Sequence, residues 1–133
     1  MIRVSNLDES VRFFVEILGF VEQRRHENTD GRYTLVFVAA PESPDTPIEL
    51  TYNWGPETYT GGRNFGHIAL EVDDIHAYCA ALMERGVTIN RPPRDGRMAF
   101  IKTPDGISIE LLQKGEALVP TEPWVSMPNT GTW

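Results

Sequence analysis

The amino-acid sequence contains the same order of segments twice, and this repeat restricts the fold more than any other feature. In each half, a short alternating segment leads into a capped amphipathic helix and then into further strand-like runs. IELTY at 48–52 corresponds to IELLQ at 109–113, and RVSNL at 3–7 corresponds to EVDDI at 71–75. Neither half could easily bury one face of its sheet alone, so the two should pack together.

The predicted fold class is α+β, with two βαβββ modules that form curved mixed sheets completed by dimerisation. Module one spans 1–54, a linker 55–64, module two 65–114 and an extended C-terminal tail 115–133. The tail, rich in Pro and Trp, should pack as an arm on the surface or on a partner subunit. The strands that the pattern identifies are 2–4, 33–39, 48–52, 67–72, 98–102 and 108–112.

Each module should contain one helix with a recognisable cap. Asn6 is the predicted N-cap of the first helix and Asp73-Asp74 cap the second, with Gly19 and Gly86 at the C-terminal ends. The side chains predicted to face inward are Val11, Phe14, Val15 and Leu18 in the first helix, and Ile75, Cys79, Leu82 and Met83 in the second.

Composition excludes several classes of function. The chain has 133 residues, which is enough for one domain with a core, and a formal net charge of −7. This charge argues against binding to nucleic acid or to an anionic membrane surface. No apolar stretch is long enough to span a membrane. Cys79 is the single cysteine, so no intrachain disulfide can form, and we expect a cytoplasmic protein.

Three residues are candidates for metal binding. Glu49 and Glu110 occupy equivalent positions in the repeat, and His67 begins the first strand of module two. A carboxylate between aliphatic residues on a strand can simply face solvent, and a single histidine is often structural. Taken together, one His and two Glu suit a divalent metal such as Ni²⁺, Co²⁺ or Zn²⁺.

Three arginines lie at the edges of predicted strands, namely Arg3, Arg63 and Arg91. Each alone could be a solvated surface charge, but as a set they could hold the carboxylates of an anionic ligand. TGGRNFG at 60–66 lacks the spacing and the Lys-Ser/Thr of a phosphate-binding loop, so nucleotide binding is not predicted.

Three motifs together resemble those of glyoxalase I, or lactoylglutathione lyase, in the vicinal oxygen chelate superfamily. They are ELTYNW at 49–54, FGHIA at 65–69 and PDGISIE at 104–110. The resemblance runs from Met1 to about Lys114. It implies metal-dependent isomerisation of the methylglyoxal–glutathione hemithioacetal to S-D-lactoylglutathione through an enediolate.

The resemblance also implies roles for individual residues. Glu49, His67 and Glu110 match metal ligands, with Glu110 as the catalytic base and Glu49 facing the other side of the substrate. The positions that match glutathione contacts are Arg3, Asn53, Arg63 and Arg91. The implied metal is Ni²⁺, with Co²⁺ or Zn²⁺ as alternatives, and the implied assembly is a homodimer whose active sites lie at the subunit interface.

One ligand position of that pattern falls outside the chain. Val72 aligns with Val4 at an offset of 68 residues, so the counterpart of His67 lies two positions before Met1. The first metal ligand of the resembled family falls at the same place. We expect either a chain shortened at its start or a variant with three protein ligands.

Two other functions remain open at this level. One is a metal-free small-molecule or antibiotic-binding protein of the same fold, in which Glu49, His67 and Glu110 would have no joint role. The other is a different metalloenzyme of the superfamily, such as an epimerase or thiol transferase.

Overall fold

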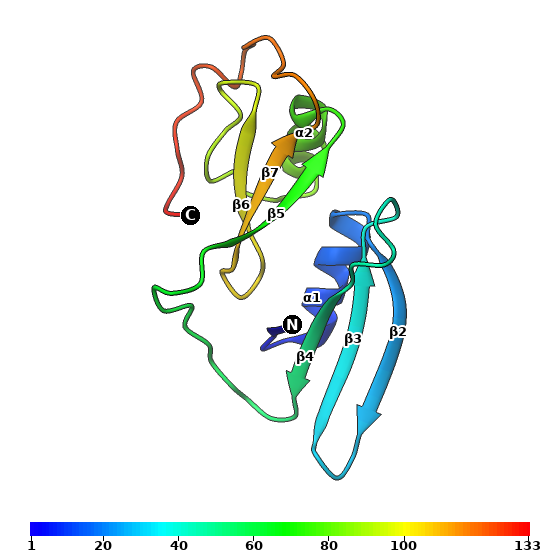
Figure 1. Ribbon diagram of the computed structural model, residues 1–133. Coiled ribbons are helices and arrows are strands. Elements are labelled where there is room, and N and C mark those ends of the chain that lie inside the picture. The colour runs from blue at the N-terminus through cyan, green and yellow to red at the C-terminus, as the bar shows by residue number, and fades with distance from the viewer. The chain divides into compact units, whose positions relative to one another are not determined.

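The computed structural model describes all 133 residues, and the chain divides into two compact units, Met1–Thr60 and Gly61–Trp133 (Figure 1). The first unit contains a four-stranded sheet in the order β1-β4-β3-β2. Its strands are β1 (Ile2–Arg3), β2 (Val21–Asn28), β3 (Tyr33–Ala39) and β4 (Ile48–Asn53). β1 pairs with β4 in parallel, and the other two pairs are antiparallel.

The helix of the first unit begins where the sequence predicts and then changes pitch. Asn6 caps helix α1 (Leu7–Arg12) and accepts a hydrogen bond from the Glu9 amide at 3.1 Å. A π-helical turn, Phe13–Ile17, follows directly. This turn rotates the buried face, so Phe13 and Ile17 are buried in place of Val11 and Val15. The core residues of the unit are Val4, Phe13, Phe14, Ile17, Leu18, Val36, Val38 and Leu50.

The second unit contains a three-stranded sheet in the order β5-β7-β6. Its strands are β5 (His67–Val72), β6 (Met98–Lys102) and β7 (Ser108–Gln113). Helix α2 (Ile75–Glu84) is capped by Asp74, which accepts from the Ala77 amide at 2.9 Å. Ile75, Cys79 and Leu82 of α2 are fully buried.

One predicted inward residue of α2 is exposed. Met83 retains 44% exposure, so the prediction that it faces inward is wrong. Met83 follows Leu82 by one position, which rotates its side chain by about 100° around the helix and away from the sheet. Its carbonyl instead accepts from the Gly86 amide while that of Leu82 accepts from Val87, which closes the helix with a Schellman motif.

The strand registers give the same repeat alignment as the sequence. Ile2 lies opposite Leu50, and Leu70 lies opposite Leu111. Because Leu50 and Leu111 are equivalent in the repeat, Ile2 corresponds to Leu70, which again gives an offset of 68 residues. The predicted α+β class with two mixed sheets is therefore confirmed, and each sheet has one parallel and at least one antiparallel pair.

The two modules differ at their second strand. The first module has β2, which the sequence analysis does not assign, whereas the second has an isolated bridge between Arg91 and Phe100. Pro92 and Pro93 follow this bridge, and neither can donate the amide hydrogen bond that a longer ladder requires.

No helix in the structure is both long enough and apolar enough to cross a membrane.

Candidate metal and substrate site

Strand alternation places the candidate residues of the first unit on one face of its sheet. Leu50 is fully buried, and its neighbours Glu49 and Thr51 point to the opposite face. Asn53 lies on the same face, two residues beyond Thr51 and four beyond Glu49. We call this the helix-free face of the first sheet, and the residues that define it are Tyr33, Leu35, Phe37, Glu49, Thr51 and Asn53.

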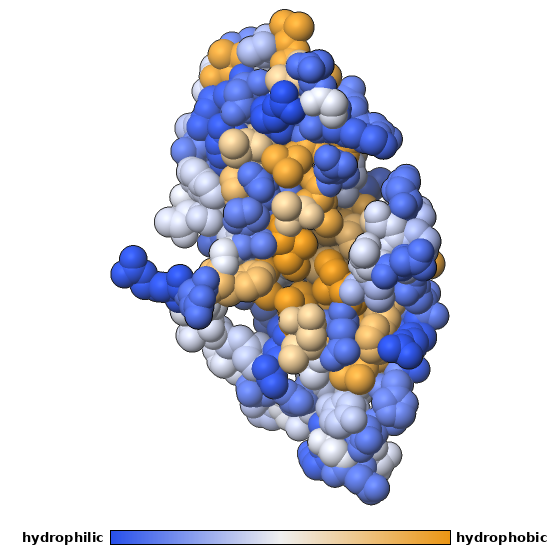
Figure 2. All heavy atoms as spheres, in the orientation of Figure 1, coloured by the Kyte–Doolittle hydropathy of each residue, from blue (hydrophilic) through white to orange (hydrophobic).

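The same rule applies to the second sheet. Ile109 and Leu111 are fully buried, so Glu110 between them points to the other side. The cross-strand partners of β7 complete the helix-free face of the second sheet. The residues that define it are His67, Ala69, Glu71, Met98, Phe100, Lys102, Ser108, Glu110 and Leu112. Apolar atoms come to the surface among polar ones over β5 and β7 (Figure 2).

His67 and Glu110 are in direct contact. The His67 Nε2 atom lies 3.0 Å from Glu110 Oε2, with the imidazole 42% exposed and the carboxylate 15% exposed. β5 and β7 are parallel neighbours in which His67 pairs with Ser108. His67 therefore lies diagonally across from Glu110, within reach of its side chain.

This pair fits a divalent metal. Imidazole nitrogen and carboxylate oxygen are ligands for ions such as Ni²⁺ or Zn²⁺, at about 2.0–2.2 Å from the ion. Two such atoms at neighbouring coordination positions lie about 3 Å apart, which is the separation observed here. No group of three or more His, Cys, Asp and Glu side chains that could hold an ion is formed in the structure. The pair therefore has the ligand chemistry of part of a metal site but does not form a complete one.

Glu49 has a partner of its own in the first unit. Its Oε1 atom accepts a hydrogen bond from Thr51 Oγ1 at 3.1 Å, and the residue is half-buried. Glu49 lies across from Phe37, as Glu110 lies across from Phe100. The two glutamates therefore share a position in the repeat, a sheet face and an aromatic cross-strand partner.

Of the predicted glutathione contacts, Arg3 and Asn53 belong to the first unit. Arg3 is exposed on β1 and pairs with Thr51. Asn53 donates to Glu57 Oε2 at 3.4 Å and to the Tyr59 hydroxyl at 3.5 Å, and this hydroxyl donates to Glu57 at 2.6 Å. Burial and the hydrogen bond to Glu57 raise the pKa of Tyr59. The Asn53 amide and the Tyr59 phenol thus meet at the end of β4, and Arg3 lies on the neighbouring strand β1.

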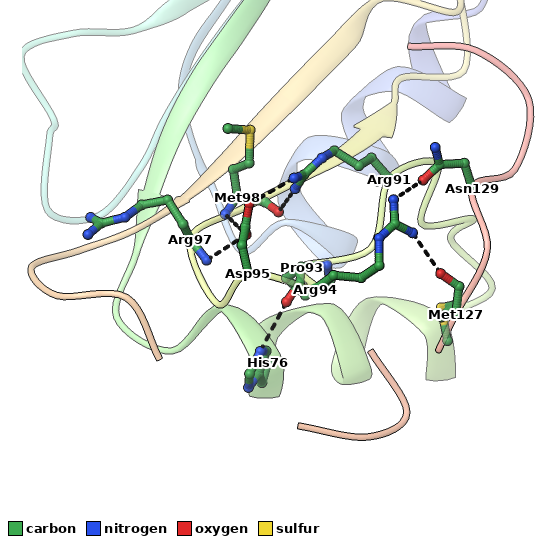
Figure 3. Close-up of polar contacts among 9 residues, drawn as sticks. All are labelled: His76, Arg91, Pro93, Arg94, Asp95, Arg97, Met98, Met127 and Asn129. Atoms are coloured by element: carbon green, nitrogen blue, oxygen red, sulfur yellow. Dashed lines mark hydrogen bonds and ion pairs between the residues drawn. The ribbon is translucent and has the colours of Figure 1, made fainter. Parts of the chain in front are cut away.

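Arg63 and Arg91 belong to the second unit and differ from each other. Arg63 is exposed in the segment before β5. Arg91 is half-buried, and its guanidinium donates to the Met98 carbonyl and to Asp95 Oδ2, the latter at 2.8 Å (Figure 3). Of these two arginines, Arg91 is the one already bound to an internal carboxylate.

Asp95 is a strong partner for Arg91. Burial alone would raise its pKa, but the hydrogen bond from Arg91 and those from the Arg97 and Met98 amides outweigh burial and lower the pKa to about 2. Asp95 is therefore ionised at neutral pH and orders the loop that Figure 3 draws.

Cys79 has no place in this site. It is fully buried in α2, and burial raises the pKa of its thiol to about 12. A protonated, enclosed thiol is not a nucleophile.

Phe37 and Phe100 are site neighbours that the sequence analysis does not identify. A signal for them exists, because VFV at 36–38 is similar to AFI at 99–101 when the loop before each glutamate strand is allowed to differ by two residues. The two phenylalanines therefore extend the repeat from the glutamate strands to the strands beside them.

The chain was compared with known proteins. The family model described as Glyoxalase/Bleomycin resistance protein/Dioxygenase superfamily matches residues 1–111. A probable lactoylglutathione lyase of Vibrio parahaemolyticus is 46% identical over 123 residues, which cover 88% of this chain and 89% of that protein.

Two solved structures are also similar. One is the trypanothione-dependent glyoxalase I of Leishmania major, with a TM-score of 0.78 and 41% identity over 85% of this chain and 82% of that one. The other is TnmS3, an antibiotic binding protein from Streptomyces sp. CB03234, with a TM-score of 0.64 and 30% identity over 86% of this chain and 91% of that one.

Proposed function

The chain belongs to the Glyoxalase/Bleomycin resistance protein/Dioxygenase superfamily, and from this membership we propose that it is a lactoylglutathione lyase. Its substrate is the hemithioacetal of methylglyoxal and glutathione, and its product is S-D-lactoylglutathione. The observation that carries the proposal is the contact between His67 Nε2 and Glu110 Oε2 at 3.0 Å on the helix-free face of the second sheet.

Glu110 is the proposed catalytic base. Its carboxylate is 15% exposed and lies beside the Phe100 ring, so few waters solvate it. Glu110 takes the proton from C1 of the hemithioacetal and returns it to C2, while the hydroxyl proton passes from the oxygen on C1 to the oxygen on C2. The C1–H bond breaks and a C2–H bond forms, so the reaction needs no oxidant or reductant.

His67, Glu110 and Glu49 are the proposed metal ligands, with Ni²⁺ as the preferred ion over Co²⁺ and Zn²⁺. When bound, the ion supplies Lewis acidity that favours negative charge on two adjacent oxygens. Within the second unit His67 and Glu110 already converge, and Glu49 occupies the equivalent of Glu110. The contact between the His67 imidazole and Glu110 also limits the movement of the Glu110 carboxylate, which transfers the proton.

Arg3, Asn53, Arg63 and Arg91 are the proposed contacts for the glutathione part of the substrate. Guanidinium groups bind carboxylates with two parallel hydrogen bonds, and distant contacts of this kind orient the reacting carbon. Arg91 must share its guanidinium with Asp95, so its contribution depends on the Asp95 pair.

We further propose a cytoplasmic homodimer in which each metal takes ligands from both chains. Within the second unit the His67–Glu110 pair has no third His, Cys, Asp or Glu that would complete a metal site, so a complete ligand set needs a contribution from outside this unit. The free thiol of Cys79 fits a reducing compartment.

The test is thioester formation by the purified chain with added Ni²⁺, followed by its ultraviolet absorbance. Glu110→Gln removes the base with little change in shape and should lower kcat by at least about 100-fold, the lower end of the effect of general base catalysis. Glu71→Gln is the matched control, because Glu71 is an exposed carboxylate on the same sheet face. It should retain wild-type turnover.

The thiol can be tested in the same assay. Hemithioacetals of glutathione and of trypanothione should be compared, because the similar enzyme from Leishmania major is trypanothione-dependent. Faster turnover of the glutathione adduct supports the proposal. Absence of turnover of both adducts with Ni²⁺, Co²⁺ and Zn²⁺ would reject it.

The similarity to TnmS3 supports one alternative, a protein that binds an antibiotic without a metal. In such a protein, His67→Ala and Glu110→Gln would leave ligand binding unchanged. Loss of a Ni²⁺-dependent thermal shift in these variants would count against this alternative.

A further inference from the structure

The C-terminal tail lies on the second unit beside residues 90–96, the segment that precedes β6 (Figure 1). Asn90 and Thr130 exchange two hydrogen bonds, each of 2.9 Å. Arg94 donates to the Met127 carbonyl at 2.7 Å and to Asn129 Oδ1 at 2.6 Å (Figure 3). Trp124 is buried and stacks on His76 at 6.1 Å. We call residues 118–133 the arm.

The end of the arm reaches the helix-free face of the second sheet. The Trp133 ring lies 6.2 Å from the Phe100 ring, with a tilt of 32°. His67 is the second aromatic neighbour of Phe100. The centroids of the two rings are 5.4 Å apart and the ring planes are at 88°, which is an edge-to-face contact. A continuous contact therefore runs from Trp133 through Phe100 to His67 and Glu110.

The repeat shows what the arm replaces. In the first unit, Phe37 lies across from Glu49 and is covered by Arg24 of β2, whose guanidinium carbon is 3.8 Å from the ring centroid. Arg24 is also the cross-strand partner of Phe37. The corresponding partner of Phe100 is Arg91.

Arg91 does not cover the Phe100 ring in this way. Its guanidinium binds Asp95 and the Met98 carbonyl instead (Figure 3). The equivalent of β2 is reduced to the isolated bridge between Arg91 and Phe100. Phe100 is nevertheless only 8% exposed on a face whose other residues are half-buried or exposed. Trp133 therefore contributes the cover that β2 supplies in the first unit.

We infer that the arm belongs to the active site of this protein and that Trp133 is a positioning residue for His67, acting through Phe100. The inference rests on the proposed function, in which His67 is a metal ligand. The His67 side chain is 42% exposed and has two described contacts, Glu110 and Phe100. If the Phe100 ring could change rotamer, the contact with Glu110 would be the remaining restraint on the His67 imidazole.

Outer contacts of this kind affect metal binding. Groups that orient a ligating histidine change metal affinity by about 10–100-fold when they are removed. An aromatic neighbour gives less restraint than a hydrogen bond, so Trp133→Ala should weaken Ni²⁺ binding by about tenfold, at the low end of that range. Trp133→Phe keeps an aromatic ring over Phe100 and should restore most of the affinity.

The first experiment uses metal-free protein and records the ¹H–¹³C signals of the His67 ring by NMR, assigned with His67→Gln. Trp133→Ala should move these signals towards those of the exposed His26, because Phe100 and its ring current are released. Trp133→Phe should stay close to wild type. Val119→Ala is the control, since Val119 lies in the arm and is 79% exposed. Coincident His67 signals in wild type and Trp133→Ala would overturn the inference.

The second experiment titrates the same four proteins with Ni²⁺ and measures turnover. Weaker Ni²⁺ binding and a lower kcat at nearly constant KM in Trp133→Ala alone support the inference. Equal Ni²⁺ affinity in wild type and Trp133→Ala refutes it. Absence of turnover in wild type refutes the proposed function instead, and the NMR comparison then still decides whether Trp133 restrains His67.

Discussion

Phe100 lies directly opposite Glu110 in the antiparallel pair of β6 and β7. The same relationship joins Phe37 and Glu49 in the first unit. An aromatic ring beside a carboxylate limits access of water on one side and leaves the other side for a ligand. The duplicated module thus repeats the aromatic cross-strand neighbour of the proposed site carboxylate as well as the carboxylate.

Removal of the His67 imidazole should abolish stabilisation by metal. A ligand that binds only the folded state at 100 times its Kd adds about 2.7 kcal/mol to the free energy of unfolding, which is a rise of several degrees in Tm. We expect this rise for wild type with Ni²⁺ and none for His67→Ala, by differential scanning fluorimetry. His26→Ala changes an exposed histidine on β2 and should behave as wild type. An undiminished shift in His67→Ala would exclude His67 as a ligand.

Asp95 should make stability depend on pH in the acidic range. Its pKa is lowered from 3.8 to about 2 in the folded protein, so its contribution is complete above pH 4 and is lost as the pH falls towards 2. Asp95→Asn should cost about 1 kcal/mol at pH 7, a size typical of a half-exposed charged group with several hydrogen bonds. The difference from wild type should shrink between pH 4 and 2 in urea unfolding. Asp30→Asn, at an exposed carboxylate, is the control, and a constant difference for Asp95→Asn would contradict the prediction.

Gly96 should be required for the arm to dock. Its φ is +65°, and a Cβ atom there would lie 2.0 Å from the Leu118 carbonyl oxygen. Gly96→Ala therefore adds a backbone clash to the cost of about 1–2 kcal/mol for a left-handed residue. Gly106→Ala is a matched control, because Gly106 has a φ of +80° and nothing within 4 Å of the added atom. Gly96→Ala should lose more stability than Gly106→Ala and should expose the arm to limited proteolysis; equal losses would argue against tight docking.

Cys79 should be protected from alkylation in the folded protein. Its thiol is fully buried, and a pKa raised from 9.0 to about 12 lowers the thiolate fraction at neutral pH by about a thousandfold. Iodoacetamide should therefore label Cys79 quickly only after denaturation, as mass spectrometry would show. Rapid labelling under native conditions would mean that α2 detaches from its sheet readily.

The sequence supports prediction of those features that leave a local or periodic signal. Asn6 and Asp74 are recognisable caps, and the alternation around Glu49 and Glu110 correctly gives buried aliphatic neighbours. β2 leaves no such signal, because seven of its eight residues are exposed and no apolar alternation marks it. The π-helical turn after Arg12 is also not predicted by a search for apolar residues at the α-helical period of 3.6 residues.

The site is predictable only in part for a similar reason. The repeat singles out Glu49 and Glu110, because their equivalent positions can be compared within the chain, whereas the counterpart of His67 falls before Met1. The contacts of the arm depend on individual side chains. Arg94 binds Asn129, which is 35 residues away in the sequence, and Trp133 contacts Phe100. No periodicity in the sequence connects such pairs.

The polar character of β2 has a consequence for the behaviour of this protein at high concentration. β2 is the outermost strand of its sheet, and an outer strand offers free backbone groups to which another chain can add. Glu22, Arg24, Arg25 and Glu27 are exposed along it, with Glu22 and Arg25 joined at 3.0 Å. A second copy that added to this edge would bring like charges together and disrupt that ion pair. The exposed charges that hide β2 in the sequence therefore also oppose edge-to-edge pairing of this sheet with a second copy.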